Sequence, residues 1–215
     1  MSQPRQQHAY SLEFGETRLD ALQRHSFEYF LQETNPVNGL VADRSEPGAP
    51  ASIAAVGFAL AVYLVGVERG WMTRTDAIER TLALMRFFWT SPQGAAADAT
   101  GHKGFYYHFL DMTTGRRAGP CELSTVDTSF LLAGILAATA FFDRENEDEQ
   151  EIRTLADALY RRTDWLWACN GGATVTHGWT PESGFLPYRW EGYDEAALLY
   201  VLGLGSPTYP LPAES

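Results

Sequence analysis

The stretch that decides the fold is residues 122–142, ELSTVDTSFLLAGILAATAFF. From Thr125 on, this stretch is apolar on almost every side of a helix, which is typical of a helix buried on most of its surface. Residues 51–69, ASIAAVGFALAVYLVGVER, have the same character and end before Gly70. Two such helices, in a chain of 215 residues that is 45% hydrophobic and 20% charged, predict a globular protein with a helical core.

Amphipathic helices are expected around these two buried helices. Apolar residues at helical spacing predict helices over residues 17–34 and 73–89, and Thr73 with Asp76 forms a capping box at the start of the second. A fifth helix follows the acidic residues 143–151 and extends to about residue 168. A sixth helix, again apolar, is predicted over residues 193–204.

The order of these helices predicts the architecture. Buried helices (the second, fourth and sixth) alternate with amphipathic ones (the first, third and fifth). Helical hairpins that alternate inner and outer helices form an α/α toroid, in which the inner helices line the core. A βαβ fold is excluded because no fully apolar strands alternate with the helices. We therefore expect an all-α protein.

Two short β-hairpins are predicted in the loops before the inner helices. One loop, residues 94–119, holds the alternating stretch 104–109 and a turn at residues 114–115. The second hairpin is predicted over residues 177–187. Both loops would lie at one end of the toroid, called the mouth below. Loops on a rigid scaffold commonly form the ligand site, so the mouth is the expected site.

Charge and composition exclude several classes of protein. The chain has 27 acidic and 16 basic residues, and this balance disfavours binding to nucleic acid. Residues 1–16 are polar and predict a flexible N-terminal tail without a signal peptide, so we expect a cytoplasmic protein. The longest apolar stretch predicts a buried helix and not a membrane span. Cys121 and Cys169 are expected to be free.

No cofactor or metal site is indicated by the sequence. His102 and His108 lie in one loop and His177 in another, without the spacing of a zinc motif, so surface or hydrogen-bonded histidines are expected. A P-loop and the GxSxG motif of serine hydrolases are both missing from the sequence. The chemistry of the site is therefore expected to depend on carboxylates.

Carboxylates and aromatic residues gather in the predicted loops. Glu122 and Asp127 bracket the start of the fourth helix, and Asp194 and Glu195 lie at the start of the sixth. Helix capping explains Asp127 and Asp194 as well as a functional role does. Aromatic faces suit sugar rings, and glycoside hydrolysis uses two carboxyl groups. The aromatic residues, which could also pack the hairpins onto the core, are Tyr106, Tyr107, Trp179, Phe185, Tyr188, Trp190 and Tyr193.

Five motifs resemble the bacterial glucoamylase-like family, which includes endo-β-1,2-glucanases and the related domain of cyclic β-1,2-glucan synthases. They occur in the family's order: GLVADRS (39–45), YHFLDMTTGRR (107–117), ELSTVDT (122–128), ESGFLPYRW (182–190) and YDEAALLYVLGLGSPTYP (193–210). The resemblance implies an (α/α)6 toroid that hydrolyses β-linked glucans, with β-1,2-glucan as the expected substrate. The family's domain is about twice as long, so residues 17–215 are expected to form its N-terminal half, with about six of about twelve helices.

The resemblance also implies site residues. The catalytic carboxylates are expected among Glu122, Asp127 and Glu195, and the general acid is either Glu122 or Glu195. The residues expected to bind substrate are Asp43, Arg44, Asp111, Arg189 and Trp190, together with three further aromatic residues of the loops, Tyr107, Trp179 and Tyr193.

Other interpretations stay open beside a truncated glycoside hydrolase. The chain could be a non-catalytic glycan-binding or residual half-domain. A toroid of the isoprenoid-cyclase kind is disfavoured, because the sequence has no Asp-rich metal motif. The expected partner is an oligo- or polysaccharide, with neither nucleic acid nor membrane. Inner helices without their neighbours would expose apolar surface, so self-association is also expected.

Overall fold

The computed structural model describes the backbone from residue 5 onward and side chains from residue 17 onward. The three helices predicted over residues 51–69, 73–89 and 125–142 are present, with ends that differ by at most two residues. The helices are α1 (Arg5–Gln32), α2 (Ile53–Glu68), α3 (Arg74–Thr90), α4 (Thr125–Phe141), α5 (Glu147–Arg162), α6 (Trp165–Ala168) and α7 (Ala197–Leu204).

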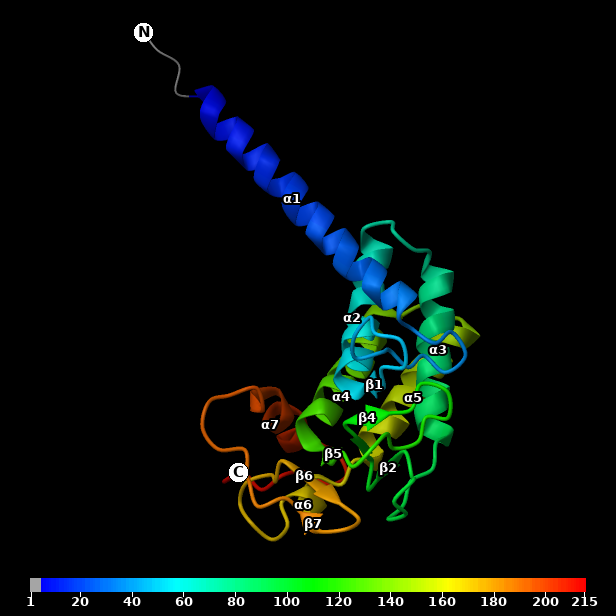
Figure 1. Cartoon of the computed structure of the whole chain (residues 1–215), viewed down its shortest axis with the longest axis vertical. Helices are drawn as coiled ribbons and strands as arrows, with labels where there is room; N and C mark the ends of the chain where they lie inside the picture. The colour runs from blue at the N-terminus through cyan, green and yellow to red at the C-terminus, as the bar shows by residue number, and fades with distance from the viewer. Residues whose placement is uncertain (1–4) are drawn as a thin grey trace.

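The N-terminal boundary differs from the prediction. Helix α1 begins at Arg5, whereas the sequence predicted a start at residue 17. Of the predicted tail, residues 1–4 lie outside the described residues, and residues 5–16 have helical backbone. The long α1 of Figure 1 packs on α2 through its C-terminal part, where Phe27 is buried and would meet any side chain at Gly66.

Two helix boundaries in the C-terminal part were predicted wrongly. Helix α5 ends at Arg162, because Thr163 is extended and the Asp164 carboxylate accepts a hydrogen bond from the Trp167 backbone at 3.0 Å, which starts the separate helix α6. Helix α7 begins at Ala197 and not at residue 193. The residues before it form a loop in which the Asp194 carboxylate accepts the Ala196 backbone N–H at 2.9 Å.

One antiparallel sheet of five short strands contains the second predicted hairpin. Its strand order is β2–β3–β5–β6–β7, with β2 (Gly101–His102), β3 (Phe105–Tyr107), β5 (Leu123–Ser124), β6 (Gly178–Thr180) and β7 (Gly184–Phe185). The second predicted hairpin is confirmed as β6–β7. A smaller sheet pairs β1 (Ala51–Ser52) with β4 (Phe109–Leu110).

A further hairpin, which the sequence did not predict, precedes the first predicted one. It joins β2 to β3 through Lys103 and Gly104, which have φ of 57° and 82°. Two consecutive residues with positive φ are what a tight two-residue hairpin turn requires. The turn predicted at residues 114–115 exists, with φ of 67° at Gly115, and the chain on its two sides pairs antiparallel at Leu110 of β4 and Arg117.

Inner and outer helices alternate as predicted. The inner helices α2, α4 and α7 lie side by side, with α4 packed against both of the others. The outer helices α3 and α5 pack on each other (Figure 1). The core between the two layers includes the fully buried side chains Leu60, Leu84, Ile135 and Leu159. The hairpins and their loops lie at the end where α4 begins, so the predicted mouth exists.

Two glycines allow the inner helices to approach closely. A Cβ atom at Gly57 of α2 would lie 2.3 Å from the carbonyl oxygen of Phe130, and one at Gly134 of α4 would lie 2.2 Å from the carbonyl oxygen of Gly57. Both distances are far below van der Waals contact with backbone that cannot easily move. The α2–α4 crossing therefore requires glycine at both positions.

A buried ion pair joins the outer helices. Arg74 at the start of α3 donates two hydrogen bonds to Glu149 of α5, at 2.9 and 2.8 Å, and a third to the carbonyl oxygen of Phe141 at the end of α4. Glu149 is only 1% exposed, and Arg74 lowers the pKa of its carboxyl to about 2. The same two helices share an exposed pair, Arg86 with Glu151.

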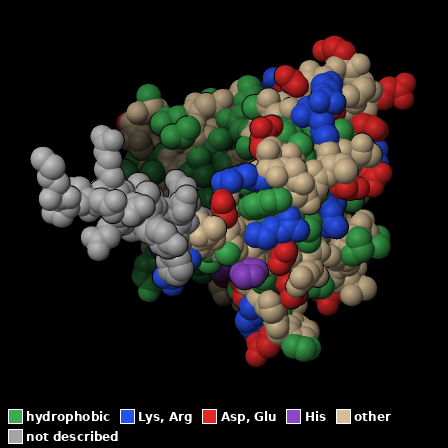
Figure 2. Space-filling view, turned by 90° about the horizontal axis from the view of Figure 1, so that it is seen from above, with side chains coloured by type: hydrophobic (Ala, Val, Ile, Leu, Met, Phe, Trp, Pro, Cys, Tyr) green, Lys and Arg blue, Asp and Glu red, His purple; other side chains and the backbone are tan. Residues whose placement is uncertain are grey.

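The inner helices leave an apolar face uncovered. Phe58 and Val65 of α2 are 46% and 39% exposed, and Val201 and Leu204 of α7 are 68% and 45% exposed. Figure 2 shows hydrophobic side chains gathered on one side of the molecule and charged side chains gathered on the other.

Among the described residues, no helix combines the length and apolar character needed to cross a bilayer.

We predict that Gly134→Ala destabilises the protein by about 1–3 kcal/mol, the usual cost of overpacking, although alanine by itself favours a helix. The free energy of unfolding in denaturant measures the effect. Gly94→Ala is the matched control, because no atom lies within 4 Å of its Cβ position, and it should change stability by less than about 1 kcal/mol. Equal stability of both variants would contradict the close-crossing argument.

We predict that Glu149→Gln costs about 3 kcal/mol of stability, because it leaves the Arg74 guanidinium without its buried anion. Glu151→Gln, in the exposed pair of the same helices, should cost less than about 1 kcal/mol. The lowered pKa of Glu149 also sets the pH dependence: its contribution is complete above the ordinary value of 4.5 and is lost as pH falls toward 2. Denaturant titrations at pH 7, 4 and 2.5 test both statements.

Candidate active site

The first turn of α4 organises the mouth. Strand β5 leads directly into this helix and lies between β3 and β6 in the sheet. Ser124 caps the helix by accepting the Asp127 backbone N–H at 3.2 Å, and Glu122 stands immediately before the strand. The His108 backbone donates to the carbonyl oxygen of Glu122 at 2.9 Å, which brings the end of β3 beside both carboxylates.

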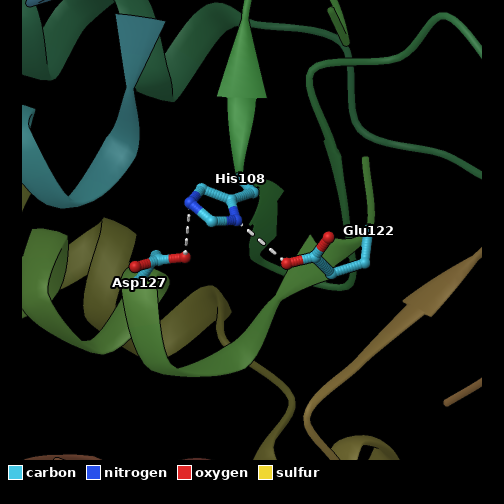
Figure 3. Close-up of side chains that lie close together, drawn as sticks. All are labelled: His108, Glu122 and Asp127. Carbon is cyan, nitrogen blue, oxygen red and sulfur yellow. Dashed lines mark hydrogen bonds and ion pairs between the residues drawn. The ribbon is translucent and has the colours of Figure 1, made fainter. Parts of the chain in front are cut away.

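His108 lies between two of the predicted catalytic carboxylates (Figure 3). Its Nδ1 is 3.0 Å from Oε1 of Glu122, and its Nε2 is 3.5 Å from Oδ2 of Asp127. The ring stacks on Phe109 with a centroid separation of 4.0 Å. All three polar side chains are partly buried, with 33%, 31% and 14% of their surface exposed. These residues are called the His108 cluster below.

The His108 cluster confirms that His108 is hydrogen-bonded, but its partners were not predicted. The sequence signal was present, since His108 stands in one conspicuous motif and Glu122 and Asp127 in another. Only the pairing of β3 with β5 brings the two motifs together.

Charge coupling within the cluster shifts two pKa values. The hydrogen bond to Glu122 raises the pKa of His108; burial opposes this rise, and the charges of Asp127 and Asp43 add to it. In the other direction, the hydrogen bond from His108 lowers the pKa of Glu122 against an opposing effect of burial. A general acid must hold a proton, so this contact makes Glu122 better suited to a role as the ionised carboxylate.

Trp190 is attached to the same helix turn. Its Nε1 donates to Oγ1 of Thr125 at 3.1 Å, and its carbonyl oxygen accepts the Tyr200 hydroxyl at 2.6 Å. The His177 ring stacks on the indole with centroids 3.8 Å apart and an interplanar angle of 18°. Trp190 is therefore held in one orientation at the mouth, half-buried, with a large aromatic side chain.

Four of the residues predicted to bind sugar have partners within the protein. Their contacts hold loops and strands in place, so the structure does not single them out as sugar contacts. Arg189 donates to the carbonyl oxygens of Cys169 and Thr174; Asp111 accepts the backbone N–H groups of Thr113 and Thr114; Trp179 packs on His102 and Trp167; and Tyr107 is buried beneath Arg117.

The remaining predicted residues are more exposed. Asp43 and Arg44 form an ion pair at 3.0 Å in the loop after α1, and the charge of Asp43 acts on His108. Tyr193 is fully exposed, and Glu195 is exposed in the loop before α7. The structure therefore brings Glu122 and Asp127 together, with Asp43 close enough to act on their histidine, and leaves Glu195 outside this group.

Among the described residues, the His108 cluster is the one group whose side chains could hold a metal ion, with its ligand atoms within 4.8 Å of one another. One histidine and two carboxylates suit several divalent cations. However, the two carboxylates approach opposite nitrogens of the ring, whereas ligands of one ion must converge on a single point. The arrangement fits a shared proton better than a shared metal.

Comparison with known proteins agrees with the motifs. A family model described as "Putative glucoamylase" matches residues 187–215, which include α7 and the loop before it. The chain is 30% identical over 209 residues to an exo β-1,2-glucooligosaccharide sophorohydrolase (non-reducing end) of Parabacteroides distasonis. This alignment covers 93% of the chain and 28% of the relative, so the chain spans less than a third of the relative's length.

Solved structures have the same arrangement of helices. A β-1,2-glucanase of Parabacteroides distasonis gives a TM-score of 0.82 at 28% identity, over 93% of this chain and 29% of that one. An endo-β-1,2-glucanase of Chitinophaga pinensis, in complex with sophorotriose and glucose, gives 0.82 at 24% identity, over 93% and 49%. The chain is thus similar over nearly its whole length to glucoamylase-like β-1,2-glucan hydrolases, and it has the fold of about half of their (α/α)6 toroid.

Proposed function

We propose that this chain supplies part of the active site of a glycoside hydrolase that cleaves β-1,2-linked glucans. The observation that carries the proposal is the His108 cluster at the first turn of α4, beside the indole of Trp190, which is hydrogen-bonded to Thr125 of the same turn. Relatives that share the fold are hydrolases of β-1,2-glucans by their names. The aromatic and acidic mouth supports the same substrate class, because sugar rings stack on indoles and hydroxyl groups bond to carboxylates.

The proposed chemistry is acid/base catalysis by two carboxyl groups. Glycoside hydrolysis needs one group that gives a proton to the leaving oxygen and one ionised group on the other side of the scissile bond. Glu122, with a lowered pKa, suits the ionised role, and Asp127 lies on the other side of the same histidine. Of the two candidates for general acid, Glu195 is therefore favoured over Glu122.

A second candidate function is glycan binding without turnover. This alternative is favoured because the chain spans only part of the length of its relatives, 28% of one and 49% of another. A site that needs groups from both halves of a toroid would bind sugar through Trp190 and the cluster without completing the reaction. Calorimetric titration with β-1,2-gluco-oligosaccharides separates the two candidates: binding with turnover supports the hydrolase, and binding without turnover supports this alternative.

We predict that Glu122→Gln lowers the rate of sugar release from β-1,2-glucan by about 10²-fold or more, as expected for loss of a catalytic carboxylate. Glu195→Gln should lower the rate to a similar degree. Glu191→Gln is the matched control for the loop before α7, where the exposed Glu191 carboxylate accepts a hydrogen bond from Thr174 at 3.3 Å, and should leave the rate within about twofold of wild type. Reducing-sugar assays at fixed pH make the measurement. Background rates in the wild-type chain would contradict the catalytic proposal.

The uncovered apolar face supports self-association. Phe58, Val65, Val201 and Leu204 lie exposed on two neighbours of α4, and apolar patches of this kind mark contact surfaces. We predict that the 215-residue chain forms dimers or larger species whose mass, measured by light scattering, falls on dilution. Val201→Glu should shift the chain to monomer, whereas Val37→Glu, in an exposed loop, should not. A monomeric wild-type chain at high concentration would contradict this.

A further inference from the structure

We infer that His108 is a positioning residue: a protonated imidazolium that holds Glu122 on one ring nitrogen and Asp127 on the other. The inference rests on the proposed function, since it assigns His108 a role in presenting the two carboxylates to a glucan. It goes further because His108 would decide which of the carboxylates can act as a proton donor.

The geometry around the ring favours a second proton. A neutral imidazole has one N–H donor and one nitrogen with a lone pair, whereas an imidazolium has two donors. In the His108 cluster both nitrogens face carboxylate oxygens, at 3.0 Å for Nδ1 and 3.5 Å for Nε2. A lone pair pointing at an ionised carboxylate would be repelled, so with both carboxyl groups ionised only the protonated ring satisfies both contacts.

The charges around the ring favour the same state. Glu122 comes from the segment before β5, Asp127 from α4, and Asp43 from the loop after α1, and all three are acidic groups that act on His108. On its remaining side the ring stacks on Phe109, which is neutral. Arg117 is the basic residue whose charge acts on Glu122, and its guanidinium is paired with Glu182 at 2.7 Å. The ring therefore faces acidic side chains from three separate parts of the chain.

The backbone holds the ring in this place. The His108 N–H donates to the carbonyl oxygen of Glu122 at 2.9 Å, and the His108 carbonyl oxygen accepts the Ile53 N–H at 3.3 Å. Ile53 is the first residue of α2, and Glu122 stands just before β5, which runs into α4. The histidine is therefore tied to the starts of two inner helices, α2 and α4. A side chain fixed on this scaffold can orient carboxylates that come from different elements.

The functional consequence concerns the division of roles. A carboxylate that accepts a hydrogen bond from an imidazolium is stabilised in its ionised form, so Glu122 would act as a base or as a stabilising anion. The proton for the leaving group then has to come from another carboxyl group, such as Glu195. Loss of the His108 proton at high pH would remove this arrangement, so the alkaline limb of the rate profile would report His108.

The direct test is NMR titration of the 215-residue chain labelled in its histidine side chains, with the His108 signal assigned from His108→Gln. We expect the His108 ring to lose its proton with a midpoint above pH 6.5, the ordinary pKa of histidine, and ¹⁵N shifts that show both ring nitrogens protonated at pH 6. Glu122→Gln should lower the midpoint, and Asp127→Asn should lower it as well. Glu151→Gln, which removes an acidic group on α5 that is paired with Arg86, is the control and should leave the midpoint unchanged.

Two results would overturn the inference. One is a wild-type midpoint at or below 6.5, or a midpoint that Glu122→Gln does not change. The other is a shift of the His108 signal when zinc chloride or calcium chloride is added at equimolar concentration, which would assign the three residues to a metal instead.

Activity measurements separate this inference from the proposed function. If β-1,2-glucan is hydrolysed, His108→Gln should lower kcat by about tenfold or more with a smaller change in KM, and should remove the alkaline limb of the wild-type pH profile. An unchanged alkaline limb would show that His108 does not position the catalytic groups, although hydrolysis stands. A wild-type chain that hydrolyses nothing, with the expected NMR midpoint, would refute the proposed function and the catalytic role of His108, and leave the bridged carboxylates as a binding feature.

Discussion

The close crossing of α2 and α4 is the contact on which the rest of the structure depends. It needs glycine at positions 57 and 134, because any side chain there would meet the backbone of the other helix. The crossing brings the inner helices α2 and α4 together, and both begin at the mouth. There Ile53 of α2 bonds to the backbone of His108, and β5 runs into α4. The site is therefore positioned by helix packing as much as by its own loops.

The same end of the molecule concentrates its chemistry on one helix turn. Ser124 caps α4, and Asp127 and Thr125 on the first turn contact His108 and Trp190 respectively. An aromatic ring and a pair of carboxylates thus share one rigid support, which suits a ligand with an apolar face and polar edges. The outer helices are joined differently. Besides apolar packing, the buried ion pair of Arg74 and Glu149 links α3 to α5.

Sequence patterns predicted the helices α2, α3 and α4 well and the other boundaries and connections less well. The apolar runs of α2 and α4 and the capping box of α3 are local signals, and these helices end where expected. The β2–β3 hairpin was missed because its turn depends on positive φ at Lys103, a residue that carries no turn signal. Helix α7 starts later than predicted, because the Asp194 side chain accepts the Ala196 backbone N–H in a loop before the helix. An Asp in the sequence does not show whether it lies in such a loop or in the first turn of a helix.

For the candidate site, the sequence by itself determined the chemistry: acidic and aromatic residues before inner helices, and motifs in the order of a glucan-hydrolase family. The tertiary structure decided which of them meet. Glu122 and Asp127 converge on His108, 14 and 19 residues away, because β3 pairs with β5, whereas Arg189 and Asp111 are engaged by nearby backbone groups. Residue type is a local property, but a contact between strands depends on register and packing, which only the folded chain specifies.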